Sequence, residues 1–204
     1  MKIYPAILSK NSKKFQEKIE LTKKFPVLHI DVMDKKFTAN KTLSLKQLLK
    51  TPQKQTYSFH LMLLKPEEQI PLLKQFKTKE VFIHYEAVKY PEQTIEDFKK
   101  NKINIGLAWN PETKIIHELA KKTNSHLIMT VNPGYSGQKF LEKNLTKIKT
   151  IKKYNPNAII MVDGGINFNT IEQVKKYEPN IIIVASGIFK GNVEENIKKW
   201  NTIL

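Results

Sequence analysis

The stretch VLHIDVMD at residues 27–34 combines the pattern of a buried strand with polar side chains. Successive side chains of a strand point to opposite faces, so His29, Asp31 and Met33 share one face and the aliphatic residues share the other. An aliphatic face is typical of the side of a parallel sheet that helices cover. A buried charge is costly unless it is paired or bound to a metal. The stretch therefore predicts a buried strand whose second face carries chemistry.

Short apolar runs alternate with segments of helical period along the whole chain, which predicts a parallel α/β sheet. Eight such units within 204 residues favour a compact (β/α)₈ TIM barrel with short loops, formed by residues 1–204 as a single domain. An open sheet of five or six strands is the structural alternative. No GxGxxG motif follows the first strand, so a dinucleotide-binding fold is not supported. We expect strands at 2–8, 27–33, 57–63, 80–86, 104–109, 126–131, 157–162 and 180–185, and helices at 13–24, 44–50, 67–76, 92–100, 112–121, 141–154, 170–177 and 193–200.

Composition excludes several classes of protein. The chain has no cysteine, which rules out disulfides and thiolate metal sites and fits a cytoplasmic protein. No apolar run approaches the roughly 20 residues of a membrane span, so we expect no membrane association. The formal net charge is +16, but every basic residue other than histidine is a lysine and the lysines are dispersed. Dispersed charge is typical of a solvated surface, so we expect no nucleic acid partner. A basic barrel that binds polyanions is the alternative from another functional class.

Other predicted strands also end in polar residues. The stretch FHLM places His60 and Met62 on one face, and MVDGGI ends its strand at Asp163. The stretch IHYE does the same with His84 and Glu86, which we interpret as supporting or core polar residues. Catalytic residues of βα barrels lie at the C-terminal ends of the strands. Two imidazoles and two carboxylates suit one divalent ion such as Zn²⁺, Mn²⁺, Fe²⁺ or Co²⁺. The candidate ligands are His29, Asp31, His60 and Asp163, with hydrogen-bonded core residues as the alternative interpretation.

Glycines follow the last three predicted strands. They occur in NPGYSGQ at residues 132–138, in the pair Gly164-Gly165 and in ASG at residues 185–187. Loops after the seventh and eighth strands of such barrels often bind phosphate through backbone N–H groups. This mode needs no arginine. The glycines therefore predict a phosphate site, and the loop at 132–138 is a candidate lid over the substrate.

With these motifs assembled, the sequence resembles the ribulose-phosphate 3-epimerase family. The resemblance runs from YPAILS at residues 4–9 to SGIF at 186–189, and its most specific pieces are HIDVMD followed by FTAN, FHLM, IHYEA, MTVNPGYSGQ and VDGGI. It implies an isomerase of the pentose phosphate pathway that interconverts D-ribulose 5-phosphate and D-xylulose 5-phosphate. It also implies a divalent metal ion, an enediolate intermediate and, since the family is often dimeric or larger, a homo-oligomer.

The resemblance assigns roles to individual positions. It makes Asp31 and Asp163 the acid–base pair as well as metal ligands with His29 and His60. Residues implied to contact substrate are Ser9, His60, the methionines Met33, Met62 and Met129 around the reacting carbons, and Ser136, Gly137, Gly164, Gly165, Ala185 and Ser186 in the lid and phosphate loops.

The chain departs from the family pattern at a few positions. MDKKF stands where the family usually has MDGHF, which brings Lys35 and Lys36 after Asp34 and puts the path of that loop in question. Ala185 replaces a glycine of the last phosphate loop, and Ser136 replaces a glycine of the lid. The candidate ligands and proton carriers are all present.

The proposed chemistry also follows from the residues. Inverting a carbon beside a ketone requires a proton to leave one face and another to arrive at the opposite face. Two flanking carboxylates suit this task, because a single base reaches only one face. The nearest alternative is a sister epimerase acting on a hexulose 6-phosphate such as D-allulose 6-phosphate, which shares the same constellation.

Overall fold

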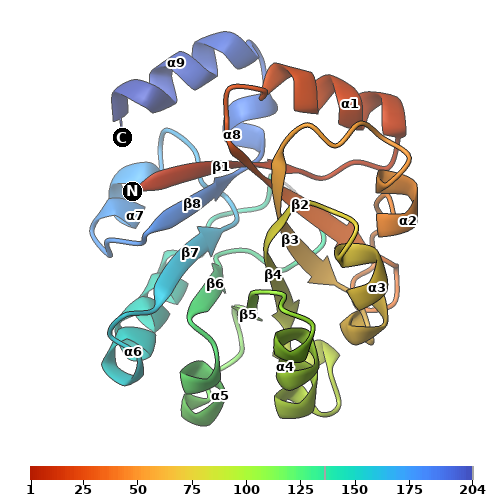
Figure 1. Cartoon of the computed structure of the whole chain (residues 1–204). Coiled ribbons are helices and arrows are strands. Elements are labelled where there is room, and N and C mark those ends of the chain that lie inside the picture. Colours follow the sequence, from red (N-terminus) through yellow and green to blue (C-terminus); the bar gives the residue numbers. More distant parts are fainter. Residues whose placement is uncertain (136, 204) are drawn as a thin grey trace.

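The computed structural model describes residues 1–135 and 137–203. Within them the strands form a closed parallel barrel in the order β1 to β8, and the helices lie around its outside (Figure 1). This confirms the (β/α)₈ barrel and excludes the open sheet. The strands are β1 (Lys2–Ile7), β2 (Val27–Met33), β3 (Thr56–Met62), β4 (Thr78–His84), β5 (Ile105–Trp109), β6 (Ser125–Met129), β7 (Ile159–Asp163) and β8 (Ile181–Val184).

Most helices are short, and local sequence signals explain where several begin. The Asn11 side chain accepts hydrogen bonds from the N–H groups of Lys13 and Lys14, and Ser44 forms a capping box with Gln47. The α-helices are α1 (Ser12–Leu21), α2 (Leu45–Leu48), α3 (Ile70–Leu73), α4 (Pro91–Lys100), α5 (His117–Lys122), α6 (Thr146–Tyr154), α7 (Ile171–Lys175), α8 (Ser186–Phe189) and α9 (Val193–Ile203), with 3₁₀ turns η1 (Pro66–Gln69), η2 (Tyr85–Ala87) and η3 (Glu142–Leu145).

The apolar core has two layers, as strand alternation requires. The larger layer lies between strands and helices and includes Leu28 and Ile30, the outward residues of β2. The smaller layer fills the barrel interior, where Phe82 and Leu127 are fully buried. Gly106 makes room for the Phe82 ring, because a Cβ at this position would lie 2.4 Å from a ring carbon. The interior is therefore packed, and polar side chains that enter it do so among apolar neighbours.

The helices predicted at 67–76 and 141–154 each begin as a 3₁₀ turn that leads into an α-helix, and two further differences are larger. The helix predicted at residues 112–121 begins only at His117. The preceding residues form a turn that donates hydrogen bonds to Glu86 from the Asn110 N–H and the Thr113 hydroxyl. This tertiary contact competes with helix formation there. The single-turn helix α8 was not predicted, since its four residues are too few to show a helical period.

None of the described helices combines the length and the apolar character needed to cross a bilayer. In α4 the buried residues are Thr94, Ile95 and Phe98, which share one face of the helix.

Candidate metal and substrate site

Three strands supply the polar side chains at the barrel mouth, which we define as the end formed by the C-termini of the strands. β2 presents His29 and Asp31 on its inner face, and β3 is paired so that His60 lies opposite Asp31. β7 ends at Asp163. The parallel register therefore brings together residues separated by more than a hundred positions in the sequence.

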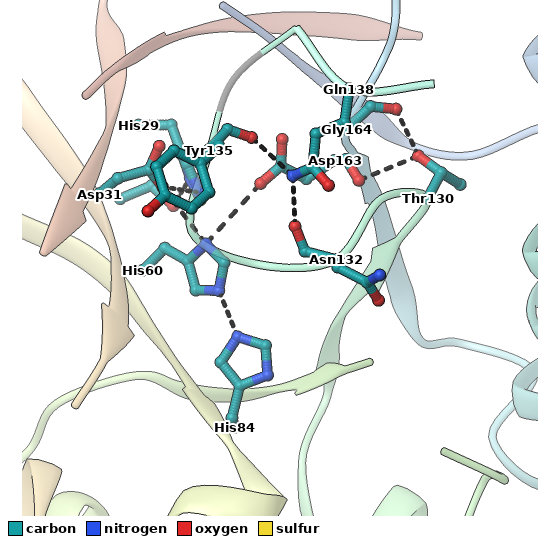
Figure 2. A network of polar contacts seen from close by, with 11 residues as sticks. His29, Asp31, His60, His84, Thr130, Asn132, Tyr135, Gln138, Asp163 and Gly164 are labelled. Atoms are coloured by element: carbon teal, nitrogen blue, oxygen red, sulfur yellow. Dashed lines mark hydrogen bonds and ion pairs between the residues drawn. The ribbon is translucent and has the colours of Figure 1, made fainter. Parts of the chain in front are cut away.

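The four side chains form one compact cluster (Figure 2). One potential ligand atom from each of His29, Asp31, His60 and Asp163 lies within 4.8 Å of all the others. The His60 Nδ1 atom is 3.3 Å from Asp31 Oδ1 and 3.7 Å from Asp163 Oδ2. The His29 Nε2 atom is 3.9 Å from the same Asp31 oxygen. Both imidazoles thus face both carboxylates across a small common space.

The atoms that face this space lack hydrogen-bond partners. Among the described residues, His29 Nε2, Asp31 Oδ1 and His60 Nδ1 are buried without one. Both histidines are fully buried, and Asp31 is 9% exposed. Buried polar atoms are normally satisfied, so three unpartnered atoms aimed at one point need an explanation. A divalent cation supplies it, because nitrogen and carboxylate oxygen donors suit Zn²⁺ and similar ions. The residues therefore fit a metal ion.

Burial also sets the charge states in the cluster. Burial lowers the pKa of His29 to about 3, against the opposing effect of Asp31. Burial, reinforced by the negative charge of Asp31, raises the pKa of Asp163 well above its usual range. A neutral imidazole is the form that binds metals, and a raised pKa favours the protonated form of the Asp163 carboxyl, which can donate a proton.

The cluster lies at the wall of a cavity in the barrel mouth. Three methionines predicted to surround the substrate, Met33, Met62 and Met129, line this cavity. The described residues that line it and were predicted as site residues are Asp31, Met33, His60, Met62, Met129, Gly137, Asp163, Gly164, Gly165, Ala185 and Ser186. His29 lies behind Asp31, against the Ser58 hydroxyl at 3.2 Å.

Two residues predicted to contact the substrate, Ser9 and Ser136, are not among the described residues that line the cavity. Among the described residues, Leu8 lines the cavity but its neighbour Ser9 does not. The Ser9 hydroxyl donates instead to the Asn11 carbonyl at 2.9 Å. A substrate contact from Ser9 stays a prediction. Ser136 lies outside the described residues.

The loops over the cavity are held by side chains to which sequence reasoning assigned no role. The Gln138 amide donates to the carbonyls of Asn132 and Tyr135, at 2.6 and 2.9 Å (Figure 2). The Asn40 amide, from the loop after β2, donates to the Gly134 carbonyl at 2.8 Å. Asn40 belongs to the FTAN stretch, so the motif was visible although its role was not. The described residues of this candidate lid are thereby held to one another and to the loop after β2.

Another unassigned residue orders the loop after β7. The Thr130 hydroxyl donates to the carbonyl oxygens of Asp163 and Gly164, at 2.9 and 2.6 Å. These contacts fix the main chain immediately after the Cα that carries the Asp163 carboxylate. The only advance signal was the position of Thr130 near the C-terminal end of a predicted strand, at residues 126–131.

The sequence departures have specific structural outcomes. Lys35 takes the left-handed backbone conformation, with φ of 66°, so the loop keeps a conformation that favours glycine. The Asp34 carboxylate accepts a hydrogen bond from the Lys36 N–H at 2.8 Å and supports this turn. Ala185 has φ of −101°, so its backbone is not in the left-handed region. The glycine lost at this position was therefore not required for a left-handed backbone.

Known proteins match the chain over most of its length. A family model described as the ribulose-phosphate 3 epimerase family matches residues 2–189. A ribulose-phosphate 3-epimerase of Helicobacter pylori (strain J99 / ATCC 700824) is 32% identical over 179 residues, covering 82% of this chain and 81% of the relative. The Bacillus subtilis (strain 168) enzyme of the same name is 32% identical over 181 residues, covering 83% of each chain.

Solved structures share the fold at low sequence identity. A 3-hexulose-6-phosphate synthase from Salmonella typhimurium superposes with a TM-score of 0.70 at 14% identity, covering 97% of this chain and 96% of that one. A phosphoribosyl anthranilate isomerase from Thermus thermophilus gives a TM-score of 0.65 at 13% identity, with both chains fully covered. These likenesses establish the barrel alone. The family match and the relatives establish more: this chain belongs to the ribulose-phosphate 3-epimerase family.

Proposed function

We propose that the protein interconverts D-ribulose 5-phosphate and D-xylulose 5-phosphate by moving a proton at carbon 3. The observation that carries the proposal is the convergence of Asp31 and Asp163, from two non-adjacent strands, on one cavity that also contains His60. Family membership gives the substrate class, and the two carboxylates give the chemistry.

In this proposal one aspartate removes the proton from carbon 3 and the other delivers a proton to the opposite face. Asp31 acts on one epimer and Asp163 on the other, and the roles exchange in the reverse direction. The raised pKa of Asp163 suits the step in which it donates, because it favours the protonated carboxyl. The intermediate between the two transfers is an enediolate.

His29, Asp31, His60 and Asp163 would hold one divalent ion, with Zn²⁺, Mn²⁺, Fe²⁺ and Co²⁺ as candidates. When bound, such an ion stabilises negative charge that develops on substrate oxygens. The buried atoms of the cluster that lack hydrogen-bond partners support this assignment. Met33, Met62 and Met129 supply walls without strong hydrogen-bonding groups, which keep water and competing donors away from the carboxylates.

The substrate phosphate would lie against the loops after β6, β7 and β8. Gly137, Gly164 and Gly165 have positive φ angles in these loops, of 79°, 114° and 68°. Such conformations allow successive N–H groups to turn toward an anion. Ala185 and Ser186 complete the same wall of the cavity.

The test is turnover of D-ribulose 5-phosphate by purified protein, with and without a chelator, beside turnover of D-allulose 6-phosphate. We expect higher kcat/KM on the pentose phosphate, loss of activity with chelator, and deuterium at carbon 3 of the product in D₂O. A preference for the hexulose phosphate would assign the sister activity. Absence of turnover on both substrates, with tight salt-sensitive binding of polyanions, would replace the proposal with a binding function.

A further inference from the structure

The contacts of His60 with His84 and Glu86 support an inference that rests on the proposed function. We propose that Glu86 and His84 are positioning residues that fix the tautomer of His60, so that its Nδ1 lone pair faces the cation. Neither residue lines the cavity described above. Their effect would pass through His60, along a chain of contacts that runs from β3 to the end of β4.

The first contact joins the two imidazoles. His60 Nε2 lies 2.7 Å from His84 Nε2, and both rings are fully buried (Figure 2). At this distance one nitrogen carries the hydrogen and the other accepts it. A neutral imidazole has one N–H, so this bond fixes both rings together. In one arrangement His60 donates and its Nδ1 is a lone pair. In the other His60 accepts and its Nδ1 carries the hydrogen, which would block metal binding.

Glu86 discriminates between these arrangements. Its Oε2 atom lies 3.6 Å from His84 Nδ1, and among the described residues neither atom has a hydrogen-bond partner. A carboxylate attracts an N–H and repels a nitrogen lone pair, strongly so in a buried setting. The hydrogen of His84 is therefore placed on Nδ1, and His84 Nε2 is left as an acceptor. His60 must then donate from Nε2, which leaves its Nδ1 lone pair toward Asp31 and Asp163.

Glu86 is itself held in place. Its Oε1 atom accepts hydrogen bonds from the Asn110 N–H, at 3.3 Å, and from the Thr113 hydroxyl. The loop that carries these donors is tied to α6 by Lys147, whose Nζ donates to the carbonyls of Asn110 and Pro111 at 2.5 and 2.7 Å. Residues 112–116 of this loop were wrongly predicted to be helical. Its turn places two donors on a carboxylate that a helix starting at residue 112 would leave without them.

The arrangement favours the metal-loaded site over the empty one. In the absence of a cation, the His60 Nδ1 lone pair would face the carboxylates of Asp31 and Asp163, at 3.3 and 3.7 Å, which is unfavourable. With a cation between them, the same lone pair becomes a ligand. Histidine ligands commonly donate their second N–H to a partner that fixes ring and tautomer, and loss of such a partner typically costs about 10- to 100-fold in metal affinity.

The test is titration of the full-length metal-free protein with Co²⁺ alone, followed by its visible absorption in competition with a chelator of known affinity. We expect Glu86→Gln to weaken Co²⁺ binding by roughly 10-fold or more. Thr113→Val should weaken it less and in the same direction. The matched control is Glu112→Gln, which removes the same charge from a side chain 83% exposed in the same loop. Its affinity should equal that of the wild type.

A second pair of variants separates positioning from general support of the fold. In a His84→Gln background the relay is already broken, so Glu86→Gln should add little further loss of affinity. Equal losses in both backgrounds would mean that Glu86 acts only by holding its loop, and the inference would be wrong. Unchanged affinity in Glu86→Gln would also overturn it. If the wild type binds no Co²⁺ at all, the metal site of the proposed function fails, and the relay fails with it. Circular dichroism establishes whether each variant is folded. If Glu86→Gln is unfolded, the Co²⁺ affinity of Thr113→Val provides the test in its place.

Discussion

The two ends of the barrel each bury a carboxyl whose pKa is raised, yet they have different surroundings. At the mouth, burial and the charge of Asp31 raise the pKa of Asp163. At the bottom, which is formed by the N-terminal ends of the strands, burial raises the pKa of Glu80 to about 7 against the opposing effects of Lys79 and Ser58. Asp163 shares its space with a second carboxylate and two imidazoles. A buried acid alone is thus weak evidence of a site, whereas several ligand atoms converging on one cavity are strong evidence.

The largest expected effect is a loss of turnover in variants that remove a carboxylate from the cluster at the barrel mouth. We expect Asp31→Asn and Asp163→Asn each to lower kcat by about 10³-fold or more, because loss of an acid–base group alone typically costs 10²–10⁴-fold. Steady-state turnover of D-ribulose 5-phosphate measures this, with circular dichroism as the control for folding. Near-wild-type turnover in either variant would remove that aspartate from the mechanism.

The next effect concerns the glycines of the mouth loops, which are not equivalent. A Cβ on Gly164 would lie 2.5 Å from the Val131 side chain and 2.9 Å from its backbone nitrogen, whereas a Cβ on Gly137 would have nothing within 4 Å. Both positions have positive φ and are strained by alanine. We therefore expect Gly164→Ala to lower the free energy of unfolding by about 1–3 kcal/mol more than Gly137→Ala does. Urea unfolding measures the difference, and equal losses would contradict the predicted clash.

A third prediction concerns Glu80 at the bottom of the barrel and the dependence of the free energy of unfolding on pH. A folded-state pKa of about 7 for Glu80, above its ordinary value of 4.5, means that the folded state holds the proton more tightly. This contribution to stability is complete below the unfolded pKa and is lost as pH rises through the folded pKa. Relative to Glu80→Gln, the wild type should therefore lose on the order of 1–3 kcal/mol between pH 4.5 and 8. Urea unfolding of both proteins at several pH values measures the gap, and a gap independent of pH would refute the assignment.

The smallest effect concerns the fastening of the lid. Asn40→Ala removes the hydrogen bond to the Gly134 carbonyl. A single hydrogen bond contributes about 1 kcal/mol, so we expect KM to rise roughly five-fold with little change in kcat. Lys41→Ala, at the neighbouring position, is the matched control. A fall in kcat with unchanged KM would place Asn40 in the chemistry rather than in the lid.

The alternation of side chains along the strands predicted the strands of the barrel and the site residues on them, because this alternation depends on local geometry. The inner-face positions of β2, β3 and β7 follow from the period of two once the strands are placed, and a closed barrel brings their ends together. The start of α5 could not be predicted, since the contacts of Asn110 and Thr113 with Glu86 are set by tertiary structure. The left-handed backbone of Lys35 could not be predicted either, because a lysine carries no sequence signal for positive φ.

The central claim is that His29, Asp31, His60 and Asp163 hold one cation in the cavity where proton transfer occurs. Anomalous diffraction from crystals grown with Co²⁺ tests it most directly. We expect a single strong peak among His29 Nε2, His60 Nδ1 and the two carboxylates, and loss of that peak in His60→Ala. A cavity without a peak, or with Asp31 and Asp163 turned away from each other, would contradict it.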